Sequence, residues 1–206
     1  MTVEPKSTNG SLNIWYISPV TPTDYDITIK SGTPIIGQAS KNCRNKDILI
    51  LWVGTNDSDI SNNAEIFCNR LKRAIDYANP KGHIVINPHV LVLTELDNAL
   101  SKEFGNSFFN WREYVSKYAL YELGITPTTQ ETLTDLQKEN GVVSDVECMQ
   151  NGTLPSSLWR RAFRAADDPL NDTGAQETFK DSTHMNVTGY RILAKKISEL
   201  IHELGM

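Results

Sequence analysis

A carboxylate and a histidine lie three residues apart near the C-terminal end of this 206-residue chain, in Asp181-Ser182-Thr183-His184. In a tight turn, this spacing lets the carboxylate accept a hydrogen bond from the imidazole Nδ1–H. That bond would leave Nε2 free to act as a general base. The structural alternative is a surface histidine near an aspartate, because such short spacings also arise by chance. Asp181 and His184 are therefore candidate catalytic residues.

A second candidate, Asn56, follows an apolar stretch in Gly54-Thr55-Asn56-Asp57. An asparagine N–H at the end of a strand can donate to an oxyanion, and one such donor stabilises a transition state by about 3 kcal/mol. An ordinary turn is the alternative, because Gly, Asn and Asp all tolerate positive φ angles. If Asn56 is an oxyanion-hole donor, it and His184 must face a shared pocket.

Hydrophobic patterning predicts the elements that would position these residues. Residues 47–53 are nearly all apolar, which is typical of a parallel strand covered on both faces. Helical spacing of apolar residues predicts helices over 62–78, 107–122 and 187–204. A further strand is predicted within 83–94 and assigned to 89–94. This order indicates an α/β fold with a parallel sheet, whose reactive residues lie in loops beyond the carboxyl ends of strands.

The remaining segments are expected to be more irregular. Residues 12–17 and 25–30 predict an antiparallel hairpin, residues 1–10 are expected to be loose, and residues 124–180 are rich in Pro, Thr, Asp and Asn. A basic and aromatic run at 159–164 (WRRAFR) could line a cleft for an anionic glycan, although one helical turn with a solvated face is the commoner arrangement. We expect a single domain over 1–206.

Composition excludes several functional classes. The net charge of −5 argues against nonspecific binding to nucleic acid, which relies on a basic surface. No apolar run approaches the roughly 20 residues of a membrane span, and no apolar leader is visible, so we expect a cytoplasmic location, or a virion tail if the chain derives from a phage. The three cysteines, Cys43, Cys68 and Cys148, suggest buried free thiols, although one pair could form a disulfide. His83, His89 and His202 show no metal-ligand spacing and are expected to be surface or strand histidines.

The two candidate motifs together resemble the SGNH (GDSL-type) hydrolase superfamily. An apolar strand that runs into Gly54-Thr55-Asn56-Asp57 is similar to the family's third block. Asp181-Ser182-Thr183-His184 before a C-terminal helix, with GYRILA at 189–194, is similar to its fifth. Stretches at 31–36, 124–128, 154–158 and 181–186 resemble SGNH domains of phage and prophage tail proteins. The resemblance spans roughly residues 31–204.

The resemblance implies a three-layer α/β/α fold with a mostly parallel, flavodoxin-like sheet. It implies a Ser–His–Asp triad that cleaves esters, often acetyl groups on sugars. His184 would be the base, Asp181 its orienting partner and Asn56 an oxyanion donor. The substrate would be an acylated small molecule or polysaccharide. No metal or organic cofactor is implied, and the chain could act as a homo-oligomer or within a larger tail assembly.

One family feature is missing, because the Gly-Asp-Ser block that carries the nucleophile is not found. Ser11, Ser18 and Ser31 are interpreted as turn serines, since each lies in a context unsuited to a nucleophile. Three explanations remain open: the N-terminal nucleophile segment has been removed, the chain is a non-catalytic descendant, or a serine arrives from unexpected topology or another subunit. The first is favoured for the origin of the chain, so that the intact ancestor would be an esterase even if this chain is inert.

Two other functions stay open. A catalytically incomplete glycan-binding or structural module of a tail fibre-like protein would show binding without turnover. A flavodoxin-like binder of small molecules ranks below it, because the sequence lacks a Gly-rich phosphate loop.

Overall fold

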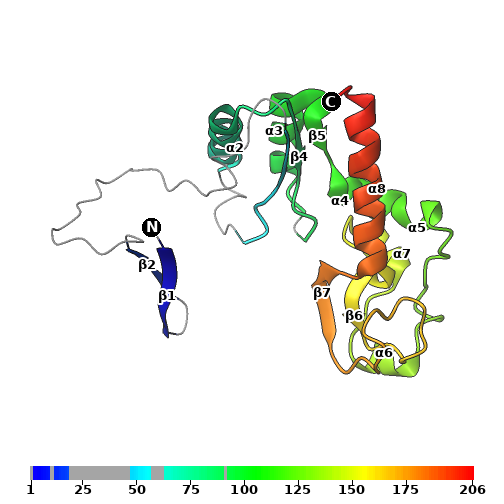
Figure 1. Cartoon of the computed structure of the whole chain (residues 1–206). Helices are drawn as coiled ribbons and strands as arrows, with labels where there is room; N and C mark the ends of the chain where they lie inside the picture. Colours follow the sequence, from blue (N-terminus) through cyan, green and yellow to red (C-terminus); the bar gives the residue numbers. More distant parts are fainter. Residues whose placement is uncertain (1, 10–11, 19–46, 57–62, 91) are drawn as a thin grey trace. The chain divides into compact units, whose positions relative to one another are not determined.

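The computed structural model describes residues 2–9, 12–18, 47–56, 63–90 and 92–206 (Figure 1). The chain divides into two units, Met1–Gly37 and Gln38–Met206. The expectation of one domain over 1–206 stays a prediction. In the part of the chain that is described, no helix is both long enough and apolar enough to cross a membrane.

The first unit contains an antiparallel hairpin of β1 (Thr2–Asn9) and β2 (Leu12–Ser18). The predicted strand at 12–17 is confirmed, but the expectation that residues 1–10 are loose is wrong. The Asn-Gly dipeptide at 9–10 is a frequent hairpin signal. The pairing of the two strands shifts register beside Pro5, and such an irregularity tolerates a residue that has no backbone N–H. The partner strand of β2 is thus residues 2–9, and the predicted strand at 25–30 lies outside the described residues.

The second unit is mixed α/β, built on a small parallel sheet. Its strands are β3 (Ile48–Trp52), β4 (Gly82–Ile86) and β5 (Phe108–Phe109), hydrogen-bonded in the order β3-β4-β5. Helix α2 (Ala64–Ala78) connects β3 to β4 and ends at Asn79, whose φ of 44° stops the helix. The predicted strand at 47–53, the helix at 62–78 and the parallel pairing are therefore confirmed.

The chain between residues 83 and 122 differs from the prediction. The assignment of a strand to 89–94 is wrong, because the chain leaves the sheet after Ile86, just before Pro88, which cannot donate a ladder hydrogen bond. Residues Thr94–Phe104 form α3, which was not expected. The single helix predicted over 107–122 is instead the short helix η1 (Gly105–Ser107), β5, α4 (Trp111–Lys117) and α5 (Ala119–Glu122).

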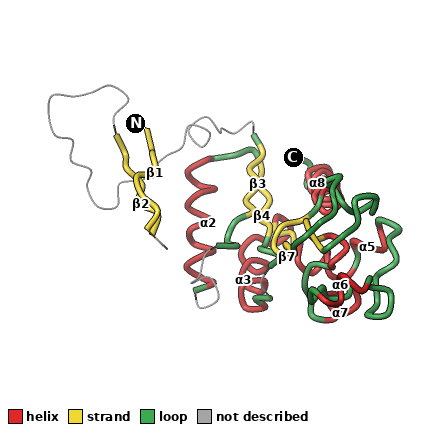
Figure 2. The backbone as a smooth tube through the Cα atoms, turned by 90° about the horizontal axis from the view of Figure 1, so that it is seen from below, coloured by secondary structure: helices red, strands yellow, loops and turns green. Residues whose placement is uncertain are grey.

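Alternate residues of β4 pack into two hydrophobic clusters. Val85 packs with α2 and α3, in a cluster of Phe67, Cys68, Leu71, Val85, Leu96 and Leu100. Ile84 and Ile86 point the other way, into a larger cluster that includes Trp111, Val115, Ile192 and Leu193. Figure 2 shows the same division, with α2 and α3 on one side of β3 and β4 and the C-terminal helix α8 (Val187–Glu203) on the other. The two-residue period of a strand thus places helices against both faces of β4.

Strand β3 is less covered than its composition suggests. Coverage on both faces was expected for residues 47–53, but Ile50 is 42% exposed and Val53 is 45% exposed. Among the described residues, β3 pairs with β4 alone and so forms an edge of the sheet. The apolar sequence of β3 is typical of an inner strand, whereas its position is that of an edge strand.

Residues 124–180 are mostly irregular, as predicted, with four short elements. These are α6 (Asp135–Glu139), α7 (Asp145–Gln150), the single turn η2 (Ser156–Leu158) and the strand β6 (Trp159–Ala162). The interpretation of 159–164 as one helical turn is wrong, because β6 pairs antiparallel with β7 (Lys180–Met185). Strand β7 leads into α8, and Asn186 caps this helix by accepting a hydrogen bond from the Gly189 N–H. The predicted helix at 187–204 is confirmed.

The two cysteines in the described residues are free and buried, as expected. Burial raises the pKa of the Cys148 thiol to about 11, so this side chain is an inert part of the core at neutral pH. Cys43 lies outside the described residues.

Glu122 joins α5 to α8 and makes stability depend on pH. Lys195 and Lys196 donate to its carboxylate, as does the Tyr114 hydroxyl, and these bonds lower the pKa of Glu122 to about 2. A carboxylate with a lowered pKa stabilises the fold above its unfolded-state pKa, near 4.5, and the effect disappears as pH falls towards 2. We therefore expect Glu122→Gln to lower the free energy of unfolding at pH 7 by about 1 kcal/mol. The difference from the wild type should shrink between pH 4.5 and about 2, as measured by urea denaturation.

The matched control for this prediction is Glu139→Gln, an exposed glutamate at the end of α6. It should leave the unfolding free energy unchanged to within about 0.5 kcal/mol. An equal, pH-independent loss in both variants would contradict the role assigned to Glu122.

Candidate functional site

The two residues of the predicted Asp–His pair contact each other on β7. His184 Nδ1 lies 3.0 Å from Asp181 Oδ2, and Asp181 Oδ1 accepts hydrogen bonds from the backbone N–H groups of Thr183 and His184. An ionised carboxylate can only accept, so Nδ1 carries the hydrogen and the lone pair of the neutral ring is on Nε2. The His184 side chain is 59% exposed, whereas that of Asp181 is 18% exposed. The imidazole is thus oriented by a mostly covered carboxylate and remains accessible to a substrate.

Asp181 stays ionised through local hydrogen bonds. Partial burial raises the pKa of its carboxyl, but the hydrogen bonds from the His184 backbone, the His184 ring and the Thr183 backbone outweigh that effect and hold the pKa below its ordinary value. At neutral pH the carboxylate can therefore orient the imidazole and would stabilise an imidazolium formed during proton transfer.

Asn56 is exposed in a turn directly after β3. The turn begins at Gly54, which is buried and has a φ of 108°, a conformation that favours glycine. Backbone geometry therefore explains the glycine in this motif. The assignment of Asn56 as an oxyanion donor stays a prediction.

Aromatic contacts bring the end of β3 towards the segment that carries His184. The Trp52 ring, on the last residue of β3, lies 5.5 Å from the His89 ring and 6.2 Å from the Tyr190 ring, measured between centroids. Tyr190 lies in the first turn of α8, six residues after His184. The strand that leads to Asn56 and the helix that follows His184 therefore meet at Trp52.

His89 is a site residue that sequence reasoning missed. It is 5% exposed, and its Nε2 lies 2.9 Å from the carbonyl oxygen of Thr183, the residue just before His184. The expectation of a surface or strand histidine is wrong for His89, which lies in the buried loop after β4. No local signal could identify it, because its partner is 94 residues away.

The basic run of β6 flanks the Asp181 side of the pair. Arg160 Nη1 lies 4.0 Å from Asp181 Oδ2, and the Arg160 side chain is 50% exposed. The Arg161 guanidinium instead packs 4.1 Å above the Phe179 ring. Arg160 is therefore the cation of this run that lies closest to the candidate pair in the described structure.

The nucleophile is not located. Within residues 47–56, 63–90 and 92–206, no serine hydroxyl forms a hydrogen bond with the His184 ring. Ser11 and Ser31 lie outside the described residues, and Ser18 ends β2 in the first unit. The structure therefore brings Asp181 and His184 together, but the described residues do not identify the serine that would complete a triad.

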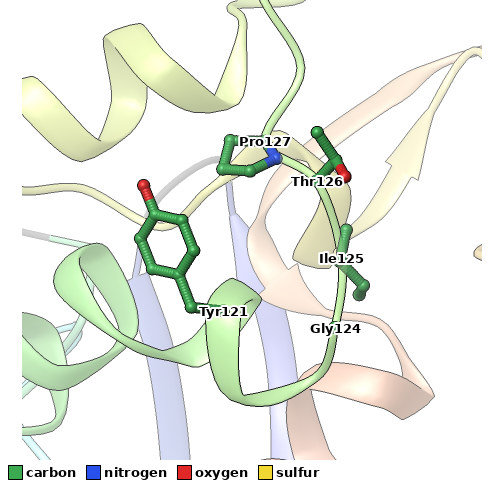
Figure 3. Close-up of a pocket in the computed structure, with 5 residues that line it drawn as sticks. All are labelled: Tyr121, Gly124, Ile125, Thr126 and Pro127. Atoms are coloured by element: carbon green, nitrogen blue, oxygen red, sulfur yellow. The ribbon is translucent and has the colours of Figure 1, made fainter.

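A shallow pocket of about 250 Å³ lies where α5 ends (Figure 3). It is lined by Tyr121, Gly124, Ile125, Thr126 and Pro127. This lining holds neither a carboxylate nor an imidazole, so it offers apolar contact rather than acid–base chemistry. In the described residues, no group of three His, Cys, Asp or Glu side chains is arranged to hold a metal ion.

No protein-family model, curated protein or solved structure matches the chain. The second unit is mixed α/β with a small three-stranded parallel sheet.

Proposed function

We propose that this chain is a serine ester hydrolase domain of the SGNH type that acts on an acylated small molecule or polysaccharide. The observation that carries the proposal is the Asp181–His184 pair, whose imidazole is oriented through Nδ1 and remains exposed. The contacts of Trp52 with His89 and Tyr190 add support, since they draw the carboxyl end of a parallel strand towards this pair.

In the proposed reaction, His184 Nε2 removes the proton from a serine hydroxyl while the serine oxygen attacks the ester carbonyl carbon. The carbonyl oxygen becomes an oxyanion, which the Asn56 side-chain N–H stabilises. The imidazolium then gives its proton to the departing alcohol oxygen, and the serine is left acylated. A water molecule, deprotonated by the same imidazole, releases the acid and restores the serine. Asp181 holds the ring in one tautomer throughout.

The proposed fold is the three-layer, flavodoxin-like arrangement of that superfamily. Its support is the packing of helices on both faces of β4. The position of β3 also fits the proposal, because among the described residues β3 pairs with β4 alone and its other edge has no hydrogen-bonded strand. The nucleophile-bearing strand would pair at this edge of β3, whether it comes from this chain, from a longer form of it or from another subunit.

The test combines turnover with covalent trapping. Purified protein is assayed with p-nitrophenyl acetate and is separately incubated with a fluorophosphonate, which reacts with activated serines. We expect turnover above the buffer rate and a single adduct by intact mass, mapped by peptide sequencing to one serine. A folded sample that neither hydrolyses the ester nor gains an adduct would contradict the proposal for this chain.

One observation favours a second candidate function, a glycan-binding or structural module of a tail fibre-like protein. His184 has no serine partner among the described residues, as expected for an incomplete triad. This function is distinguished by calorimetric binding of an acetylated polysaccharide without release of acetate. Acetate release would instead support the hydrolase.

A further inference from the structure

We propose that His89 is a positioning residue that holds the backbone of the Asp181–His184 pair in place beside the end of β3. The inference rests on the proposed function for its catalytic meaning, while its structural content can be tested without turnover. It concerns a buried histidine that neither the motifs nor the proposed mechanism uses.

The hydrogen bond to Thr183 determines the tautomer of His89. A carbonyl oxygen only accepts, so His89 Nε2 must carry the hydrogen that it donates to the Thr183 carbonyl. The other ring nitrogen, Nδ1, is buried and has no hydrogen-bond partner in the described structure. Burial also lowers the pKa of His89, so the ring is neutral at pH 7. His89 is therefore an uncharged donor with a single, specific bond.

With the His89 bond, both backbone polar groups of Thr183 have a hydrogen-bond partner. The Thr183 N–H donates to Asp181 Oδ1, and the Thr183 carbonyl accepts from His89. Both peptide groups of this residue are thus oriented, and the second of them leads directly to His184. Because His184 is exposed, its ring is positioned by Asp181 and by this backbone rather than by dense packing around it. Without the His89 bond, this peptide would keep the hydrogen bond from the His184 N–H to Asp181 Oδ1 and lose the one at its carbonyl oxygen, so it would be held less firmly.

His89 also contacts the other half of the site. Its ring packs against Trp52 at the end of β3, four residues before Asn56. A single buried side chain therefore contacts the strand that precedes the expected oxyanion donor and bonds the residue that precedes the expected base. Catalysis depends steeply on such spacing, since a displacement of about 1 Å can reduce the rate by roughly 100-fold.

The test compares substitutions that differ in where they place a donor. In His89→Gln, the side-chain amide nitrogen can occupy the place of Nε2, whereas in His89→Asn the shorter side chain cannot reach it. His89→Phe keeps a ring against Trp52 and removes the donor. The asparagine and glutamine variants are matched in polarity, so they preserve the comparison if the phenylalanine variant does not fold.

Two readouts are measured. In p-nitrophenyl acetate hydrolysis, we expect kcat to fall about 10- to 100-fold in the Asn and Phe variants with KM unchanged, and to be largely restored in the Gln variant. By NMR, the Thr183 and His184 amides should exchange about two- to tenfold faster in the Asn and Phe variants than in the wild type or the Gln variant. The His184 Nδ1 proton signal should broaden in the same two variants.

The outcomes separate the two proposals. A wild type without turnover would contradict the proposed function, and the NMR comparison would still decide the role of His89. Folded Asn and Phe variants whose Thr183 and His184 amides exchange at the wild-type rate would overturn the positioning role. A uniform loss of kcat in all three variants, the Gln variant included, would also overturn it.

Discussion

His184→Ala is expected to reduce kcat/KM for p-nitrophenyl acetate by at least about 1,000-fold. The imidazole is the only group in the proposed mechanism that both takes the proton from the nucleophile and returns it to the leaving alcohol. Alanine at this exposed position leaves no buried cavity, because the His184 side chain is 59% exposed. The loss should therefore appear in activity and not in stability, as measured by ester hydrolysis beside thermal unfolding.

The matched control is His202→Ala, which removes an exposed imidazole from the last turn of α8. It should hydrolyse the ester at the wild-type rate. If both alanine variants retain full activity, the ester cleavage arises elsewhere on the protein and the assignment of His184 as the base is wrong.

Asp145→Ala is expected to lower the free energy of unfolding by about 3–5 kcal/mol, which is a large fraction of the stability of a typical domain. Asp145 is fully buried at the start of α7. Its carboxylate accepts four hydrogen bonds, from the backbone N–H groups of Thr128 and Ser157 and from the hydroxyls of Ser156 and Ser157. Removing the carboxylate leaves these four donors without their acceptor in the protein interior, where each unsatisfied group costs about 1–3 kcal/mol.

The measurement for Asp145 is chemical denaturation, supported by a fall in Tm of roughly 10 °C. Glu147→Ala is the control, since this residue lies on the same short helix with an exposed side chain. Its effect should stay within about 0.5 kcal/mol. A similar small change in Asp145→Ala would show that the buried carboxylate does not stabilise the region between Thr128 and Ser157.

Patterns within a short stretch of sequence predicted the elements whose formation depends on neighbouring residues. The apolar run at 47–53, the periodic segments of α2 and α8, and the hydrogen bond between Asp181 and His184 all depend on residues close in sequence. The missed strand at residues 2–9 had a local signal in the Asn-Gly dipeptide at 9–10, whereas other errors arose where a distant partner decides the outcome. The loop after β4 has an apolar sequence typical of a strand, yet the buried Asn87 side chain bonds Asp97 and Asn110, and Arg112 pairs with Asp97. The Asn87 side chain therefore contacts α3 and the N-cap residue of α4, and Pro88 follows it in the chain.

For this protein, the sequence by itself determined the candidate base, its carboxylate partner and the parallel α/β class, because short-range spacing and hydrophobic period specify all three. Only the tertiary structure decided that β6 pairs with β7, that β3 lies at an edge of the described sheet and that His89 binds the backbone beside His184. Those features depend on contacts between residues far apart in the chain, and such contacts form only when the whole core packs.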